Sequence, residues 1–134
     1  PQIVEMVARG IDMFDCVLPT RLARHGMAFT AQGTLNLKNA LYAEDAGPIE
    51  AGCGCYACRY FLRGAIRHFL KANEILGVRL VSIHNLYFYL QLMQTIRAAL
   101  EKGSFDKFRS EFVSNYKRHN ECDDLISDDK APNA

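Results

Sequence analysis

The sequence has no stretch of about 18 uncharged apolar residues, the length that a membrane-spanning helix needs. It also has no excess of one charge, because 16 lysines and arginines face 15 aspartates and glutamates, for a formal net charge of +1. A strongly basic composition, the simplest indication of nucleic-acid binding, is therefore missing. No secretory signal is visible at the start, where Glu5 and Arg9 fall within the first ten residues and no methionine precedes Pro1. We expect a piece of a longer, cytoplasmic protein that does not associate with membranes.

The composition that is present is typical of a folded domain. Of the 134 residues, 49% are hydrophobic and 23% are charged, which is enough apolar material for one core. No internal repeat interrupts the chain. Its last stretch, residues 119–134, is acidic, and we expect a solvated, mobile tail there.

The first third of the chain predicts a mixture of helix and strand. Residues 2–9 have apolar positions at helical spacing and end at Gly10, whereas residues 11–18 form a short apolar run closed by Pro19. We interpret this run as a buried strand, so that helix and strand together form one unit of a parallel sheet or barrel. Two further short strands, at residues 27–30 and 34–38, predict a hairpin that turns at Gln32-Gly33. Residues 42–52 read as a loop.

The second half predicts three helices, over residues 59–73, over residues 84–102 and from Ser104 onward. On the second of them we place one apolar face, formed by Leu86, Tyr89, Leu90, Met93, Ile96 and Leu100. Gly103 would end that helix, and Ser104 would cap the next one. The aromatic side chains of the last helix recur at helical spacing and are expected to pack in the core: Phe105, Phe108, Phe112 and Tyr116.

Three of the five cysteines, Cys53, Cys55 and Cys58, lie on one short segment. Cysteines two and three residues apart are poorly placed to bridge one another, so thiolates gathered for a metal in a reducing compartment fit better than a disulfide framework. A tetrahedral zinc then needs a fourth ligand. His84 fits this role at the expected start of a helix, and His68 competes for it. Four protein ligands would leave no open position, so the zinc would be structural.

The other two cysteines fall outside this group. We expect a buried thiol at Cys16 and a tail thiol at Cys122.

A second chemical signal is the aspartate near the end of the predicted strand. Catalytic groups of (β/α) barrels stand at the carboxyl ends of their strands. Asp12 and Asp15 would point to opposite faces of a strand, and Asp15 is closer to the exit at Pro19. A carboxylate there can act as a base, a metal ligand or a nucleophile, or it can simply cap backbone groups.

Beyond these signals, the chain resembles the tRNA-guanine transglycosylases of the bacterial type. The resemblance spans nearly the whole sequence and rests on residues 10–21, on the Cys-x-Cys-x-x-Cys loop and on His84-Asn85. Further matching stretches are residues 35–39, 47–49 and 73–77.

The resemblance implies an α/β fold, namely the C-terminal part of a (β/α)8 TIM barrel with a zinc-binding subdomain and C-terminal helices. The corresponding division of the chain is a last helix–strand region of the barrel (1–25), the zinc-binding subdomain (26–84), closing helices (85–118) and the acidic tail (119–134).

The resemblance also implies roles for individual residues. Asp15 would be the nucleophile that displaces guanine at the wobble position, number 34, of tRNAs with GUN anticodons and forms a covalent ribosyl intermediate. A 7-deazaguanine base (preQ1) would then replace guanine, in queuosine biosynthesis. The residues matching the family's tRNA-recognition segment are Thr20, Arg21, Leu22, Ala23 and Arg24. Those matching its ligands for one structural Zn2+ are Cys53, Cys55, Cys58 and His84.

Further expectations concern the association of the chain with other copies and its activity on its own. The resemblance implies a homodimer through the zinc subdomain, where Phe61 and His68 could take part, and Leu62 departs from the small polar residue expected at its position. The family's general acid/base aspartate would lie upstream of Pro1, so the chain alone is expected to be inactive. The alternative is a non-catalytic, zinc-stabilised subunit that binds tRNA or a partner. The presence of Asp15 beside the arginine segment favours the enzyme.

Overall fold

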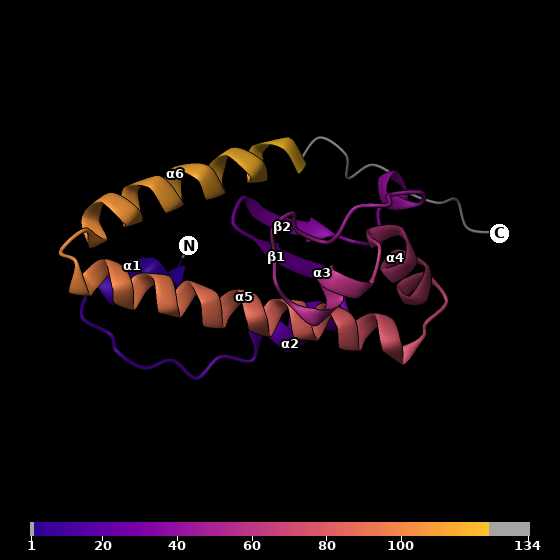
Figure 1. Ribbon diagram of the computed structural model, residues 1–134, viewed down its shortest axis with the longest axis horizontal. Helices are drawn as coiled ribbons and strands as arrows, with labels where there is room; N and C mark the ends of the chain where they lie inside the picture. Colours follow the sequence, from indigo (N-terminus) through magenta and orange to yellow (C-terminus); the bar gives the residue numbers. More distant parts are fainter. Residues whose placement is uncertain (1, 124–134) are drawn as a thin grey trace, which may run out of the picture.

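The computed structural model describes residues 2–123, which form seven helical segments and one two-stranded sheet within that range. The elements follow one another as α1 (Gln2–Ala8), α2 (Leu18–Arg24), β1 (Met27–Thr30), β2 (Gly33–Asn36), the 3-10 helix η1 (Ala40–Tyr42), α3 (Tyr56–Tyr60), α4 (Arg63–Lys71), α5 (Ile75–Glu101) and α6 (Phe105–Asp123). Figure 1 shows α5 as the long element along which the others are arranged, with α6 returning beside it after a turn at Gly103.

Two clusters of buried side chains pack along α5. The first lies around the hairpin, α2, α3 and α4, and it includes the fully buried Leu37, Ile49 and Ile66. The second joins α1, the later part of α5 and α6 through Val4, Leu92 and Ile96. The first cluster therefore surrounds the cysteine loop, whereas the second holds the terminal helices together.

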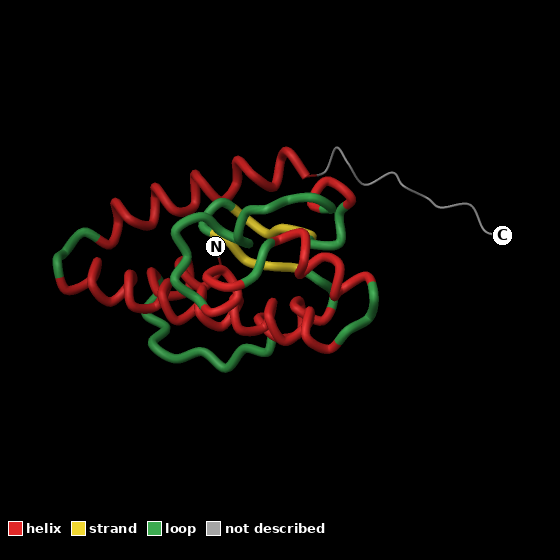
Figure 2. Tube along the Cα trace, turned by 45° about the vertical axis from the view of Figure 1, so that its right-hand side comes forward, coloured by secondary structure: helices red, strands yellow, loops and turns green. Residues whose placement is uncertain are grey.

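The predicted hairpin is confirmed. Strands β1 and β2 pair antiparallel, with Met27 opposite Asn36 and Thr30 opposite Gly33, and Figure 2 shows the pair in yellow among the helices. The Thr30 hydroxyl donates a hydrogen bond to the Gly33 carbonyl oxygen at 2.8 Å, which closes the turn. The hairpin supplies the surface on which α5 and α2 pack.

The predicted strand at residues 11–18 is wrong. Residues 11–17 have no regular structure and run along the outside of α5 (Figure 1), and α2 already begins at Leu18. Met13 is 88% exposed and Val17 63% exposed. A strand forms only when a neighbour accepts and donates its ladder hydrogen bonds, and within residues 2–123 the only sheet is β1–β2. The barrel itself is accordingly not visible in this chain, and Cys16, expected to be buried, is exposed.

The helices of the second half also differ from their predicted bounds. The first is broken at residues 61–62 into α3 and α4, and α5 begins at Ile75, nine residues before the predicted start at His84. A Cβ at Gly77 would lie 2.9 Å from the backbone nitrogen of Leu70, so this glycine lets α4 and α5 approach closely. The connection between the two helices turns at Asn73, which has a φ of +57°.

The predicted apolar face of α5 is wrong at Leu86, Leu90 and Leu100, which are exposed, whereas Ile96 is buried as predicted. The buried positions of α5 are Gly77, Leu80, Val81, His84, Asn85, Leu92, Ile96 and Ala99. Two polar residues therefore lie on the core face, which a pattern of apolar residues cannot indicate.

The third predicted helix is confirmed as α6, and its aromatic side chains pack inward. Neighbouring rings of this series lie 5.7–6.4 Å apart between centroids, and Tyr116 is buried. The predicted tail begins inside this helix, which continues to Asp123, and residues 124–134 lie outside the described part of the chain. The surroundings of the Cys122 thiol likewise lie outside the described side chains. Among the described helices, none is long and apolar enough to cross a membrane.

Candidate metal centre

Three cysteines and one histidine converge beside the hairpin. Cys53 and Cys55 come from the loop before α3, Cys58 from α3 itself and His84 from the middle of α5. The Nδ1 atom of His84 lies 3.7, 3.5 and 3.4 Å from the sulfurs of Cys53, Cys55 and Cys58, and all four candidate ligand atoms lie within 4.8 Å of one another. One metal ion could therefore be held by all four side chains.

The orientation of the imidazole agrees with this role. His84 is completely buried, and its Nε2 lies 2.7 Å from the carbonyl oxygen of Phe29. Because a carbonyl can only accept, Nε2 carries the proton and Nδ1 presents its lone pair to the sulfurs. Metal-ligating histidines ordinarily use their second nitrogen in this way, which fixes both the tautomer and the ring orientation.

The three thiols titrate as a linked set because their sulfurs share hydrogen bonds. The hydrogen bond from Cys58 lowers the pKa of Cys55 to about 4, although burial acts against it. That same hydrogen bond, together with burial, raises the pKa of Cys58, and burial raises the pKa of Cys53. Cys55 is thus the first to become a thiolate, the form in which cysteine binds metal.

Local backbone structure holds the cysteine loop in place. The Cys55 sulfur accepts a hydrogen bond from the Cys58 backbone N–H at 3.3 Å, which begins helix α3. A Cβ at Gly54 would lie 2.8 Å from the hydroxyl of Tyr87, so a larger residue between the first two cysteines would displace that side chain. The spacing of Cys55 and Cys58 in the sequence therefore helps to determine the shape of the loop.

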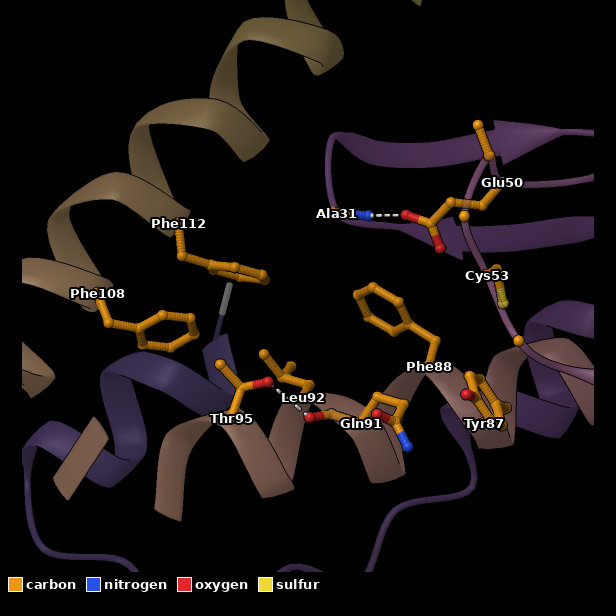
Figure 3. A pocket seen from close by; sticks show the side chains of 13 residues that line it. Ala31, Glu50, Cys53, Tyr87, Phe88, Gln91, Leu92, Thr95, Phe108 and Phe112 are labelled. Atoms are coloured by element: carbon orange, nitrogen blue, oxygen red, sulfur yellow. Dashed lines mark hydrogen bonds between the residues drawn. The ribbon is translucent and has the colours of Figure 1, made fainter. Parts of the chain in front are cut away.

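The same loop is tied to the hairpin through Glu50. Its Oε1 accepts a hydrogen bond from the Ala31 backbone N–H at 2.8 Å, and Figure 3 shows this contact at the edge of a hollow of about 370 Å³. Cys53 also borders this hollow, opposite the rings of Phe108 and Phe112 on α6. The carboxylate thus links the turn of the hairpin to the segment that carries the ligands.

Arg63, the first residue of α4, holds the loop before the cysteines in place, a role that the sequence did not reveal. Its guanidinium donates to Asp45 Oδ2 at 2.8 Å, to the Pro48 carbonyl oxygen at 3.0 Å and to the Ile49 carbonyl oxygen at 3.2 Å. The loop from η1 to the cysteines is therefore organised by one side chain from α4.

The structure distinguishes between the two histidines that are candidates for the fourth metal ligand. His68 is exposed on α4 and is not part of the group of metal-ligating residues. His84 belongs to the group, although it lies in mid-helix and not at the helix start from which we argued.

Asp15 and the segment from Thr20 to Arg24 lie elsewhere in the fold. Asp15 is exposed and lines a second hollow of about 370 Å³, which also includes Leu18, Leu22 and the ring of Phe29. On α2, Ala23 is fully buried against the core, whereas Arg21 and Arg24 are exposed. The structure therefore places the carboxylate directly before a short helix with two exposed arginines, and it does not bring Asp15 into the metal group.

Asn85 is a further residue whose importance the sequence did not indicate. It is completely buried, and its side-chain amide makes three hydrogen bonds to backbone atoms of α2 and β1. The sequence signals were the family resemblance at His84-Asn85 and the position of these two polar residues between Ile83 and Leu86.

Comparison with known proteins gives one consistent result. The model of a family described as queuine tRNA-ribosyltransferase matches residues 1–118. The chain is 58% identical over 115 residues to the queuine tRNA-ribosyltransferase of Pelotomaculum thermopropionicum, a match that covers 86% of this chain and 31% of that protein. It is 56% identical over 114 residues to the protein of the same name from Symbiobacterium thermophilum, covering 85% of this chain and 28% of the relative. For the protein of that name from Halothermothrix orenii, the identity is 54% over 114 residues, covering 85% and 31%. The chain thus spans a little under a third of the length of these relatives.

Proposed function

Because the chain belongs to the queuine tRNA-ribosyltransferase family, we propose that it supplies the metal-braced C-terminal part of a tRNA-guanine transglycosylase. The observation that carries this proposal is the match of the family over residues 1–118, which includes both Asp15 and the four residues of the metal centre. The position of Asp15 on the wall of a hollow, directly before the arginines of α2, supports it.

In the proposed reaction, the Asp15 carboxylate attacks C1′ of the ribose at the wobble guanosine, position 34 of tRNAs with GUN anticodons. A carboxylate–C1′ ester bond forms while the N-glycosidic bond breaks, and guanine leaves with the bonding electron pair and takes up a proton. A 7-deazaguanine base such as preQ1 then loses a proton and attacks C1′, which breaks the ester and frees Asp15. Two displacements at one carbon retain its configuration, as in retaining glycosidases, and a carboxylate stabilises the oxocarbenium-like transition state of each.

The target base must leave the anticodon stack to reach the carboxylate, as in other enzymes that act on a single base. Arg21 and Arg24 are exposed next to Asp15 in the sequence, and we assign them to the backbone of the anticodon loop. Thr20, Leu22 and Ala23 complete this segment and set the position of the helix. Phosphate contacts of this kind fix the register of the nucleic acid without requiring a basic domain.

We assign the metal as zinc. Three sulfurs and one imidazole nitrogen are the donor set of closed tetrahedral zinc sites, and four protein ligands leave no position for a reacting water. When bound, the ion supplies folding free energy, on the order of 10–16 kcal/mol in small zinc domains, and takes no part in the chemical steps.

A chimaera tests the proposed activity. The C-terminal part of the Pelotomaculum thermopropionicum protein is replaced by residues 1–134 of this chain, and incorporation of labelled guanine into tRNA is measured. We expect exchange within about tenfold of that of the unaltered relative, given 58% identity over the replaced part. A chimaera that binds tRNA and zinc but exchanges no guanine would instead support a non-catalytic binding subunit.

The arginines of α2 provide a second prediction. In the chimaera, replacing both Arg21 and Arg24 by alanine should raise KM for tRNA while kcat changes little, and the salt dependence of tRNA binding should weaken by about two units of slope. The matched control is Lys107→Ala, which removes an exposed cation on α6. Equal effects of the two changes would contradict the assignment of α2 to the tRNA.

We further propose that the zinc subdomain joins two copies of the protein. Among the large apolar side chains that it exposes are Leu41, Tyr56, Tyr60 and Leu62, with exposed fractions of 53–73%. Phe61 contacts the ring of Tyr56, and His68 lies exposed on α4. Exposed apolar side chains gathered in one region are typical of interaction surfaces.

Tyr60→Lys should therefore shift the protein from dimer to monomer in light scattering, because it puts a charge into the apolar contact. Leu100→Lys, a change of the same kind at the far end of α5, should leave the dimer intact. A monomer in the unaltered protein would contradict the proposed dimer.

A further inference from the structure

The backbone of Phe29 is held from two sides by consecutive residues of α5. Its carbonyl oxygen lies 2.7 Å from the metal-site histidine, at Nε2 of His84, and its N–H donates to Asn85 Oδ1 at 2.9 Å. Both side chains are completely buried. The metal centre is therefore linked to one residue of β1 by a hydrogen bond without an intervening solvent layer.

From Asn85 the connection continues to α2. Its Nδ2 donates to the carbonyl oxygen of Pro19 at 2.9 Å and to that of Met27 at 3.0 Å. The amide thus accepts one hydrogen bond and donates two. Rotating it by 180° would place its oxygen against two carbonyl oxygens, which cannot donate. The side chain has one acceptable orientation, and in that orientation it joins α5, β1 and α2.

We propose that Asn85 is a positioning residue that transmits the placement of the metal centre to helix α2 and thereby fixes the segment from Asp15 to Arg24. The connection runs from the metal ligand His84 to the Phe29 backbone, then to the Asn85 amide and the Pro19 carbonyl. The ring of Phe29 lines the hollow that Asp15 also lines, so the same residue carries the connection to that hollow.

Helix α2 packs on α5 and β1 through apolar side chains such as the buried Ala23, and Asn85 adds a directional hydrogen bond to this packing. Residues 11–17 have no regular structure, and α2 itself has only seven residues and no side-chain cap at its beginning. A helix of this length is not stable alone and depends on tertiary contacts. The Pro19 carbonyl that accepts the hydrogen bond from Asn85 lies in the first turn of α2. A shift of this carbonyl would change the direction of the whole helix.

The experiment compares backbone hydrogen exchange with and without metal in the complete 134-residue chain. The amides of His25 and Gly26, which close α2, report on the helix, and those of Ile96 and Ala99, two buried residues in the later part of α5, serve as internal reference. We expect chelation of the metal to speed exchange at the α2 amides at least about tenfold and at the reference amides less than about threefold. An equal change at both sets, or no change at α2, would overturn the proposal.

Substitution supplies the second arm. Asn85→Asp keeps the volume and the acceptor for Phe29 N–H but loses the two donors. With metal bound at full stoichiometry, its α2 amides should already exchange rapidly, and chelation should add less than about threefold. Ser82→Ala, which removes a half-buried hydroxyl one turn earlier on α5, should behave like the unaltered chain. If Asn85→Asp retained slow α2 exchange, Asn85 would not be the connection; if the variant did not fold, the chelation result for the unaltered chain would decide.

The consequence for tRNA rests on the proposed function, whereas the exchange measurement does not. In the chimaera described above, Asn85→Asp should raise KM for tRNA about tenfold with metal content unchanged and kcat lowered by less than that factor. A purely structural role would lower the amount of active enzyme and hence kcat, with KM unaltered, and that result would overturn the positioning role. An inactive chimaera would contradict the proposed function and leave the exchange result to stand on its own.

Discussion

Replacing His84 by alanine should release the metal and unfold the first of the two buried clusters. The substitution removes one of four ligands and also the partner of the Phe29 carbonyl oxygen, which becomes a buried acceptor with no donor. Loss of a partner that only orients a ligand already costs about 10–100-fold in metal affinity, so loss of the ligand should cost more. Since bound metal stabilises the folded state, the variant should unfold at a much lower temperature. Metal content by mass spectrometry and thermal unfolding by circular dichroism measure both effects.

The chain provides a matched control for each type of ligand. His68→Ala changes the other candidate histidine, and Cys16→Ala changes an exposed cysteine outside the group, so both variants should retain about one zinc per chain. Cys58→Ala should lose zinc as His84→Ala does. Zinc retained by His84→Ala and lost from His68→Ala would show that the fourth ligand had been wrongly chosen.

The convergence of the three cysteines into one candidate metal group could be predicted from the sequence because most of the information is local. Three cysteines within six residues favour a metal-binding loop, and their spacing along the chain does not depend on the rest of the fold. The hairpin and α6 are similar cases, since turn residues and a helical aromatic stripe determine them within a short window. The fourth member of the group needed long-range information, and our argument from a helix start selected the histidine that joins the cysteines for a reason that the structure does not support.

The wrong predictions for residues 11–18 and for the apolar face of α5 have a common physical origin. In both cases the structure depends on contacts with residues far away in the sequence. Residues 11–17 have the composition of a buried strand, but a strand needs partners, and the described part of this chain offers none to that segment. On α5, His84 and Asn85 occupy the core face because cysteine sulfurs and backbone groups satisfy them there. A search for apolar faces therefore selected Leu86, Leu90 and Leu100, which are exposed. Buried polar residues at such a position are more informative than the apolar residues around them.

Replacing Asp15 by asparagine should abolish guanine exchange in the chimaera, with a loss of at least about 10³-fold, because the nucleophile of a covalent mechanism has no substitute. Asparagine keeps the shape of the side chain but lacks the negative charge that attacks C1′ and stabilises the oxocarbenium-like transition state. Asp15 is exposed and makes no contact with the metal group, so the variant should fold and bind zinc normally. Exchange of labelled guanine, with zinc content measured on the same samples, separates loss of chemistry from loss of structure.

The neighbouring aspartate makes the experiment decisive. Asp12 is exposed in the same irregular segment, three residues earlier, so Asp12→Asn changes the local charge by the same amount without touching the proposed nucleophile. It should retain exchange within a few-fold of the unaltered chimaera, since a surface charge at this distance is largely screened by salt. The covalent ribosyl intermediate, trapped on denaturation, should appear on Asp15 when the tryptic peptide of residues 10–21 is fragmented in the mass spectrometer. An adduct on Asp12, or full exchange by Asp15→Asn, would mean that the irregular segment presents a different carboxylate to the ribose. The assignment of Asp15 as the nucleophile would then have to be abandoned.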